Sequence, residues 1–67
     1  MIRLTVNGEL RELEAPVALT QFLERHNIHR RQIAVEHNGT ILRRREFEGV
    51  TLQDGDVLEI VHMVGGG

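Results

Sequence analysis

The fold is organised around the closing segment of the chain, which reads Leu58-Glu59-Ile60-Val61-His62-Met63-Val64-Gly65-Gly66-Gly67. Residues 57–64 form the longest strand candidate in the chain, and this strand runs directly into three glycines. Leu58 and Ile60 lie two residues apart and therefore share one face of the strand. We expect that face to lie under a helix.

The opposite face of this strand carries Val57, Val61 and Met63, with Glu59 as its only charged residue. If no second layer covers this face, it leaves an exposed apolar patch beside the glycines, of the kind that marks a docking site. We therefore predict that Val57, Val61, Met63 and Val64 contact a partner protein. The alternative is that another element buries them.

A β-hairpin is predicted at the other end of the chain. Ile2, Leu4 and Val6 alternate with polar residues, which indicates a strand with one buried face. Asn7-Gly8 follows at once and supplies the positive φ angles of a type I′ turn, so residues 9–13 should fold back antiparallel. Leu10 and Leu13 are out of phase with each other, which predicts a bulge or an early strand end.

One amphipathic helix of about eleven residues is predicted next, because its apolar positions recur at the spacing of a helix face. These positions are Leu19, Phe22, Leu23 and His26. Ala15-Pro16 precedes the helix, no Ser, Thr or Asp stands at its expected start, and Asn27 is a plausible end.

A second hairpin follows, with Asn38-Gly39 as its turn. Its strands, residues 33–35 and 40–42, carry apolar residues on both faces, so we expect both faces to be covered. Residues 43–49 should form a connector or one helical turn that Phe47 attaches to the core. Asp54-Gly55-Asp56 predicts a third tight turn.

This order of elements predicts an α+β fold, namely a ubiquitin-like β-grasp. It has a mixed sheet of four to five strands, one main helix on one face, and the first and last strands parallel at the centre. We expect residues 1–64 to form this domain and residues 65–67 to form a flexible glycine tail.

Composition argues against several classes of function. The chain has 67 residues, a net charge of -2 and 3% aromatic residues, so it lacks the basic face and stacking platforms of nucleic-acid-binding proteins. No apolar run approaches the roughly 20 residues needed to span a membrane, and the cytoplasm is the expected compartment. There is no Ser, Cys, Tyr or Lys, which leaves Thr5, Thr20, Thr40 and Thr51 as possible side-chain nucleophiles. We therefore expect a protein that is not itself an enzyme.

The glycine ending predicts a reactive terminus. Glycine has no Cβ, so residues 65–67 could enter a narrow channel, and they reach roughly 10 Å when extended. A terminal carboxylate at Gly67 is a poor electrophile and must first be activated, usually as an acyl adenylate made from ATP. An inert, disordered terminus is the competing interpretation.

Taken together, these motifs make the chain similar to the ThiS family of sulfur carriers of thiazole biosynthesis. The resemblance covers essentially the whole chain, and although each motif is weak alone, their order is specific. The motifs are Ile2-Arg3-Leu4-Thr5-Val6-Asn7-Gly8-Glu9, Asn38-Gly39, Arg44 with Phe47, Leu52-Gln53-Asp54-Gly55-Asp56 and Val64-Gly65-Gly66-Gly67.

The resemblance implies a mechanism in which the chain is a carrier. A ThiF-like enzyme would adenylate the carboxylate of Gly67 with ATP, and a sulfur donor protein would supply the sulfur of a thiocarboxylate. A ThiG-like thiazole synthase would then take the sulfur for the thiazole ring of thiamine. Gly67 would carry the sulfur, Gly65 and Gly66 would give access to it, and the chain would bind no cofactor.

Other interpretations stay open at this point. A MoaD-like sulfur carrier for molybdopterin synthesis has the same fold and ending, and a ubiquitin-like modifier or an interaction domain with an inert tail belongs to a different class. A metal site is disfavoured. Such a site usually needs three or four converging ligands. His26 and His29 could be neighbours, but nothing in the sequence places His37 or His62 near them.

Overall fold

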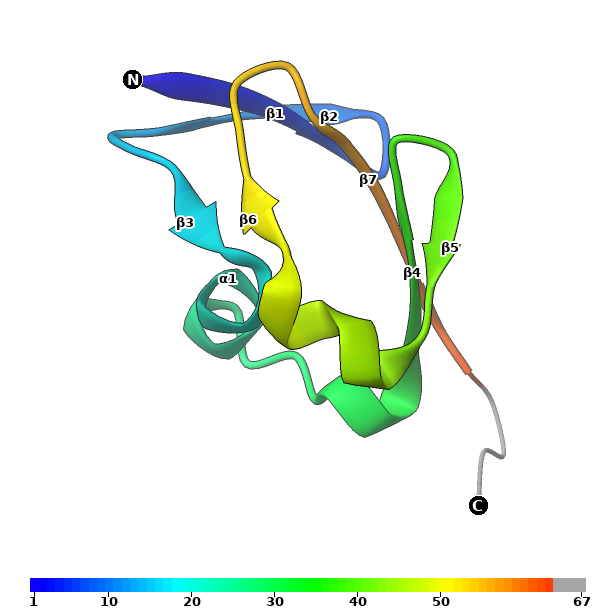
Figure 1. Cartoon of the computed structure of the whole chain (residues 1–67). Helices are drawn as coiled ribbons and strands as arrows, with labels where there is room; N and C mark the ends of the chain where they lie inside the picture. The colour runs from blue at the N-terminus through cyan, green and yellow to red at the C-terminus, as the bar shows by residue number, and fades with distance from the viewer. Residues whose placement is uncertain (64–67) are drawn as a thin grey trace.

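The computed structural model describes residues 1–63, in which a five-stranded mixed sheet carries one α-helix on one face (Figure 1). The elements in chain order are β1 (Ile2–Val6), β2 (Glu9–Leu13), β3 (Val17–Ala18), α1 (Leu19–Arg25), the 3-10 helix η1 (Arg30–Gln32), β4 (Ile33–His37), β5 (Thr40–Leu42), the 3-10 helix η2 (Arg44–Gly49), β6 (Thr51–Leu52) and β7 (Val57–His62). The predicted β-grasp architecture is confirmed.

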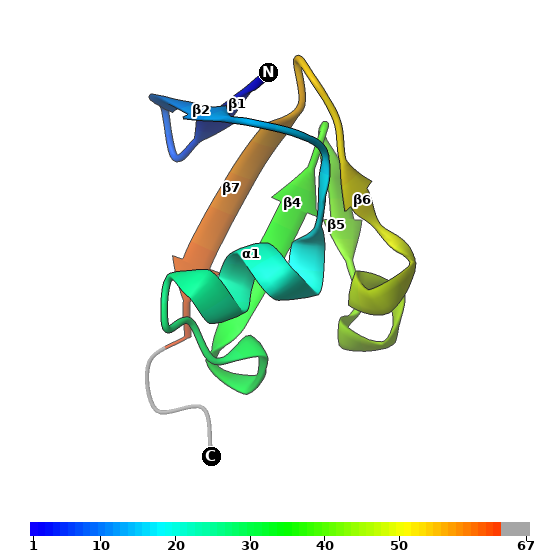
Figure 2. The same ribbon diagram turned by 90° about the vertical axis from the view of Figure 1, so that its left-hand side faces the viewer.

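Strand β7 is the centre of the sheet, whose order is β2-β1-β7-β4-β5. It pairs parallel with β1, as predicted for the first and last strands, and it pairs antiparallel with β4 on its other side. Seen from the helix side, α1 lies in front of β4 and β7 (Figure 2). One face of the sheet is therefore covered by α1.

Both Asn-Gly turns have the predicted geometry. Asn7 and Gly8 have φ angles of 51° and 82°, and Asn38 and Gly39 have 50° and 86°, as the two central residues of a type I′ turn require. The expected bulge or early strand end in residues 9–13 is wrong, because all five residues of β2 pair in register with β1. Leu10 and Leu13 are out of phase because they lie on opposite faces of a regular strand.

The core lies between the sheet and α1. It contains Leu4, Val35, Leu58 and Ile60 from the sheet, and Leu19, Phe22 and Leu23 from the helix. Leu58 and Ile60 are buried, as the alternation in this strand predicts. Phe47 is 1% exposed, so it does attach the η2 turn to the core.

The α-helix is shorter than the predicted eleven residues, because Val17 and Ala18 belong to strand β3 and the helix begins only at Leu19. Its end at Asn27 is as predicted. Asn27 has a φ of 55°, and its N–H donates to the carbonyl oxygen of Glu24. The N–H of Ile28 donates to the carbonyl oxygen of Leu23, which completes a Schellman motif. His26 therefore lies at the helix C-cap and is exposed, although its ring still contacts Phe22 with centroids 4.5 Å apart.

The helix begins without a side-chain cap, as expected. The N–H of Leu19 instead donates to the carbonyl oxygen of Val50 at 2.9 Å. A two-stranded sheet of β3 and β6, which the sequence analysis did not predict, holds Val50 and Leu19 in this position. Strands of two residues are too short to show a periodic pattern.

The face of the sheet away from α1 is uncovered in the described part of the chain. Ile41 is 72% exposed, so the expectation that both faces of the second hairpin are covered is wrong. A single helix covers one side of a sheet, and within residues 1–63 no other element packs on the far side. No helix in this part of the chain is long and apolar enough to cross a membrane.

Candidate functional site

The uncovered sheet face, here called the outer face, is the first part of the candidate site. Val57, Val61 and Met63 were predicted from alternation to lie on one side of the last strand, and they are 43%, 61% and 46% exposed. Their exposure agrees with the predicted patch, while partner binding by these residues stays a prediction.

Two more exposed apolar side chains join the outer face from other strands. Leu10 pairs with Thr5, which in turn pairs with Val57, so these three residues form one row across β2, β1 and β7. Ile41 pairs with Glu36 and so lies on the same face at β5. Apart from Met1, every exposed large apolar residue among residues 1–63 belongs to this face or continues it.

Leu10 and Ile41 were not predicted to lie on this face, although the two hairpin turns determine which face each residue occupies. A two-residue turn fixes strand register. It places Val6 opposite Glu9 and His37 opposite Thr40, so the faces of Leu10 and Ile41 follow by counting.

Side-chain hydrogen bonds from both Asn-Gly turns hold β7 in place. The amide of Asn7 accepts from the N–H of Ile60 at 2.7 Å and donates to its carbonyl oxygen at 3.2 Å. Asn38 Oδ1 accepts from the N–H of Val57 at 2.8 Å. Asn7 thereby continues the hydrogen bonding of β7 beyond the end of β1, and the backbone under the outer face is held on both sides.

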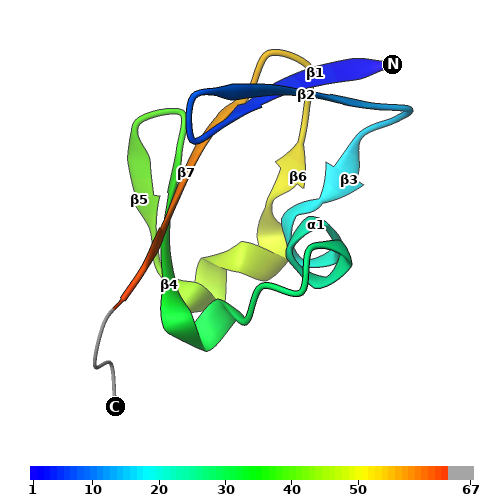
Figure 3. The same ribbon diagram turned by 180° about the vertical axis from the view of Figure 1, so that it is seen from behind.

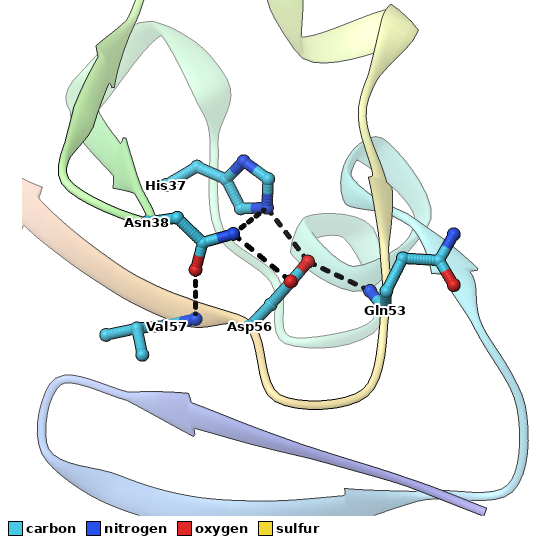
Figure 4. A network of polar contacts seen from close by, with 5 residues as sticks. All are labelled: His37, Asn38, Gln53, Asp56 and Val57. Carbon is cyan, nitrogen blue, oxygen red and sulfur yellow. Dashed lines mark hydrogen bonds and ion pairs between the residues drawn. The ribbon is translucent and has the colours of Figure 1, made fainter.

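A polar network at the start of β7 connects two turns (Figure 4). Asp56 Oδ2 lies 2.9 Å from His37 Nε2 and accepts from the N–H of Gln53 at 2.9 Å, while Oδ1 accepts from Asn38 Nδ2 at 3.1 Å. Burial by itself raises the pKa of Asp56, but the hydrogen bonds from His37, Gln53 and Asn38 outweigh it and hold this pKa below its usual value of 3.8. The network stabilises the ionised carboxylate.

This pKa predicts how stability depends on pH. Because the pKa of Asp56 is lower in the folded state, its contribution is present above the unfolded pKa and is lost as the pH falls through the folded value. We expect Asp56→Asn to lower the free energy of unfolding by about 1–3 kcal/mol at pH 7. The difference from wild type should shrink below about pH 4 in urea titrations. A difference that is constant from pH 7 to pH 3 would contradict this account.

The described chain ends beside η1, away from the β1–β2 hairpin (Figure 3). The N–H of Met63 donates to the carbonyl oxygen of Gln32 at 2.9 Å, just beyond the last residue of β7. The predicted site residues Val64, Gly65, Gly66 and Gly67, and the predicted tail of residues 65–67, lie outside the described residues.

The remaining charged and histidine side chains form no metal site in the described part of the chain. No three His, Asp or Glu side chains of residues 1–63 gather in an arrangement that could hold a metal ion. Arg30 forms an ion pair with Glu48 at 3.3 Å, and the run of Arg43, Arg44 and Arg45 is solvent-exposed.

Comparison with known families identifies the chain. A model of the ThiS family matches residues 4–67. The chain belongs to the ThiS family. Among solved structures, the thiamine biosynthesis protein (ThiS) from Geobacter metallireducens matches this ThiS-family fold with a TM-score of 0.84 and 32% identity, covering 98% of this chain and all of that one.

This ThiS-family chain is similar both to a small protein and to one part of a much longer protein. It is 37% identical over 49 residues to the sulfur carrier protein ThiS of Bacillus subtilis, covering 73% of this chain and 74% of that protein. It is 36% identical over 66 residues to a thiazole synthase of Paramagnetospirillum magneticum, which is 98% of this chain but 20% of that protein. The chain thus spans about a fifth of the length of the thiazole synthases it matches.

Proposed function

We propose that this chain is a sulfur carrier for thiazole formation in thiamine biosynthesis, and that it is not itself an enzyme. The observation that carries the proposal is the ThiS-family match, which extends through the terminal glycines to residue 67. The same match favours thiazole formation over the alternatives of molybdopterin synthesis and protein modification. The expected compartment is the cytoplasm.

In this proposal the carboxylate of Gly67 reacts in two steps on a ThiF-like enzyme. The carboxylate oxygen attacks the α-phosphorus of ATP, so that an acyl adenylate forms and pyrophosphate leaves. Sulfide from a sulfur donor protein then adds to the carbonyl carbon, and the C–O bond to AMP breaks as the C–S bond forms. The products are a thiocarboxylate and AMP, and a ThiG-like thiazole synthase takes up the sulfur.

In this proposal the outer face binds the partner enzyme, and the terminal glycines present the reactive carboxylate to it. Strand β7 carries Val57 and Val61 on its exposed side, and residues 64–67 follow it closely in the sequence. A partner that binds the outer face is therefore bound to the strand from which the reactive terminus continues. Gly65 and Gly66, which have no side chains, give that partner access to Gly67.

The test is the intact mass of the 67-residue chain after incubation with ATP, a sulfide source and a ThiF-like enzyme already shown to load a known ThiS carrier. We expect the mass to rise by the difference between sulfur and oxygen, and fragmentation to locate the change at the C-terminal peptide. Omission of ATP is the control and should leave the mass unchanged. An unchanged mass in the complete reaction would refute the proposal.

A further inference from the structure

Two carboxylates lie directly opposite each other in the middle of the outer face. Glu36 on β4 and Glu59 on β7 are paired in the antiparallel register, so their side chains point to the same side. Residues paired in this way have Cβ atoms about 4.5–5.5 Å apart, and like charges in such a pair destabilise a sheet. Folding alone therefore gives no reason for this pair.

No cation in the described part of the chain neutralises these carboxylates. Within residues 1–63, neither Glu36 nor Glu59 takes part in an ion pair or a side-chain hydrogen bond. Arg3, an arginine on the same face, is paired with Glu12 at 3.3 Å. The acidic pair is thus open to a group from outside the domain.

Apolar side chains surround the acidic pair on the outer face. Val57 and Val61 lie two residues before and after Glu59 on β7, and Ile41 pairs with Glu36 from the next strand. A protein that covers these apolar side chains also removes water from both carboxylates. Because buried charges are stable only when they are paired, such a partner must supply a cation at this point.

We propose that Glu36 and Glu59 together receive an arginine or lysine side chain of the adenylating enzyme when this enzyme binds the outer face. Arginine suits the pair best, because its planar guanidinium donates several hydrogen bonds in fixed directions. This inference rests on the proposed function for the identity of the partner. The matching surface of the partner should therefore carry one arginine or lysine side chain with apolar side chains around it.

The test compares the wild type with Glu36→Gln/Glu59→Gln in binding to the ThiF-like enzyme at low and high salt. Loss of the charge pair should weaken binding by about 30-fold or more and reduce its salt dependence. The same variant should unfold at a higher temperature, since the repulsion is removed, whereas loss of a merely structural contact would lower that temperature. Glu14→Gln/Glu24→Gln, which removes two exposed carboxylates that lie outside the five-stranded sheet, is the matched control and should bind like the wild type.

The outcomes separate this inference from the proposed function. If the wild type acquires sulfur and the double variant binds within about twofold of it, the acidic receptor is refuted and the carrier function stands. Equal weakening by Glu14→Gln/Glu24→Gln would also refute the receptor, because it would show that net charge alone is responsible. Absence of any binding by the wild type would overturn both proposals.

Discussion

Deletion of Gly66 and Gly67 is expected to abolish thiocarboxylate formation while leaving the fold and the binding of the adenylating enzyme intact. The deletion moves the terminal carboxylate back by about 7 Å at full extension, which takes it out of reach of the adenylation site. The described fold ends at Met63 and does not include the deleted residues. The measurement is intact mass after the loading reaction, with enzyme affinity and thermal unfolding measured in parallel.

A second variant tests whether loading depends on the position of the terminal carboxylate or only on the presence of the glycines. The full chain with one alanine added after Gly67 keeps all three glycines but ends in a different carboxylate. We expect this variant to bind the enzyme and to gain no sulfur at Gly67. Loading of the truncated chain at the wild-type level would show that the carboxylate need not stand at Gly67, and would contradict the role proposed for the terminal glycines.

Val61→Asp is expected to weaken binding of the adenylating enzyme by about 30-fold or more, because the partner would have to bury an additional unpaired carboxylate on the outer face. Val61 is 61% exposed and makes no part of the core, so the free energy of unfolding should change by no more than about 1 kcal/mol. Binding by calorimetry and urea denaturation measure the two effects separately.

Val61→Thr is the matched control for this variant, since it keeps the branched shape that suits a strand and introduces no charge. Its binding should lie between those of the wild type and Val61→Asp. If Val61→Asp binds as tightly as the wild type, the enzyme does not cover this part of the outer face, and the docking surface proposed here is wrong.

The elements that sequence reasoning located are those whose signals are local. Asn7-Gly8 and Asn38-Gly39 dictate tight turns because both central residues need positive φ, and the apolar spacing of Leu19, Phe22 and Leu23 is compatible only with a helix face. The alternation in β7 likewise separated the buried Leu58 and Ile60 from the exposed Val57 and Val61. For each of these, the interaction that decides the conformation lies within a few residues.

The misjudged features depend on contacts between distant segments. The exposure of Ile41 could not be read from its own strand, because it depends on the absence of a second layer over the outer face in the described chain. The pairing of β3 with β6 and the hydrogen bonds from Asn7 to Ile60 join residues that are far apart in the sequence.

The order of residues along the chain was therefore enough to predict a small β-grasp domain, since turn chemistry and apolar periodicity act over short distances. The acidic pair and the apolar side chains around it could not be predicted from the sequence, because they are neighbours only when β7 lies between β1 and β4. Glu36 and Glu59 are 23 positions apart in the chain, and sheet register alone makes them neighbours on one face. A surface that recognises a partner is built from several strands, so its chemistry becomes visible only when those strands are assembled.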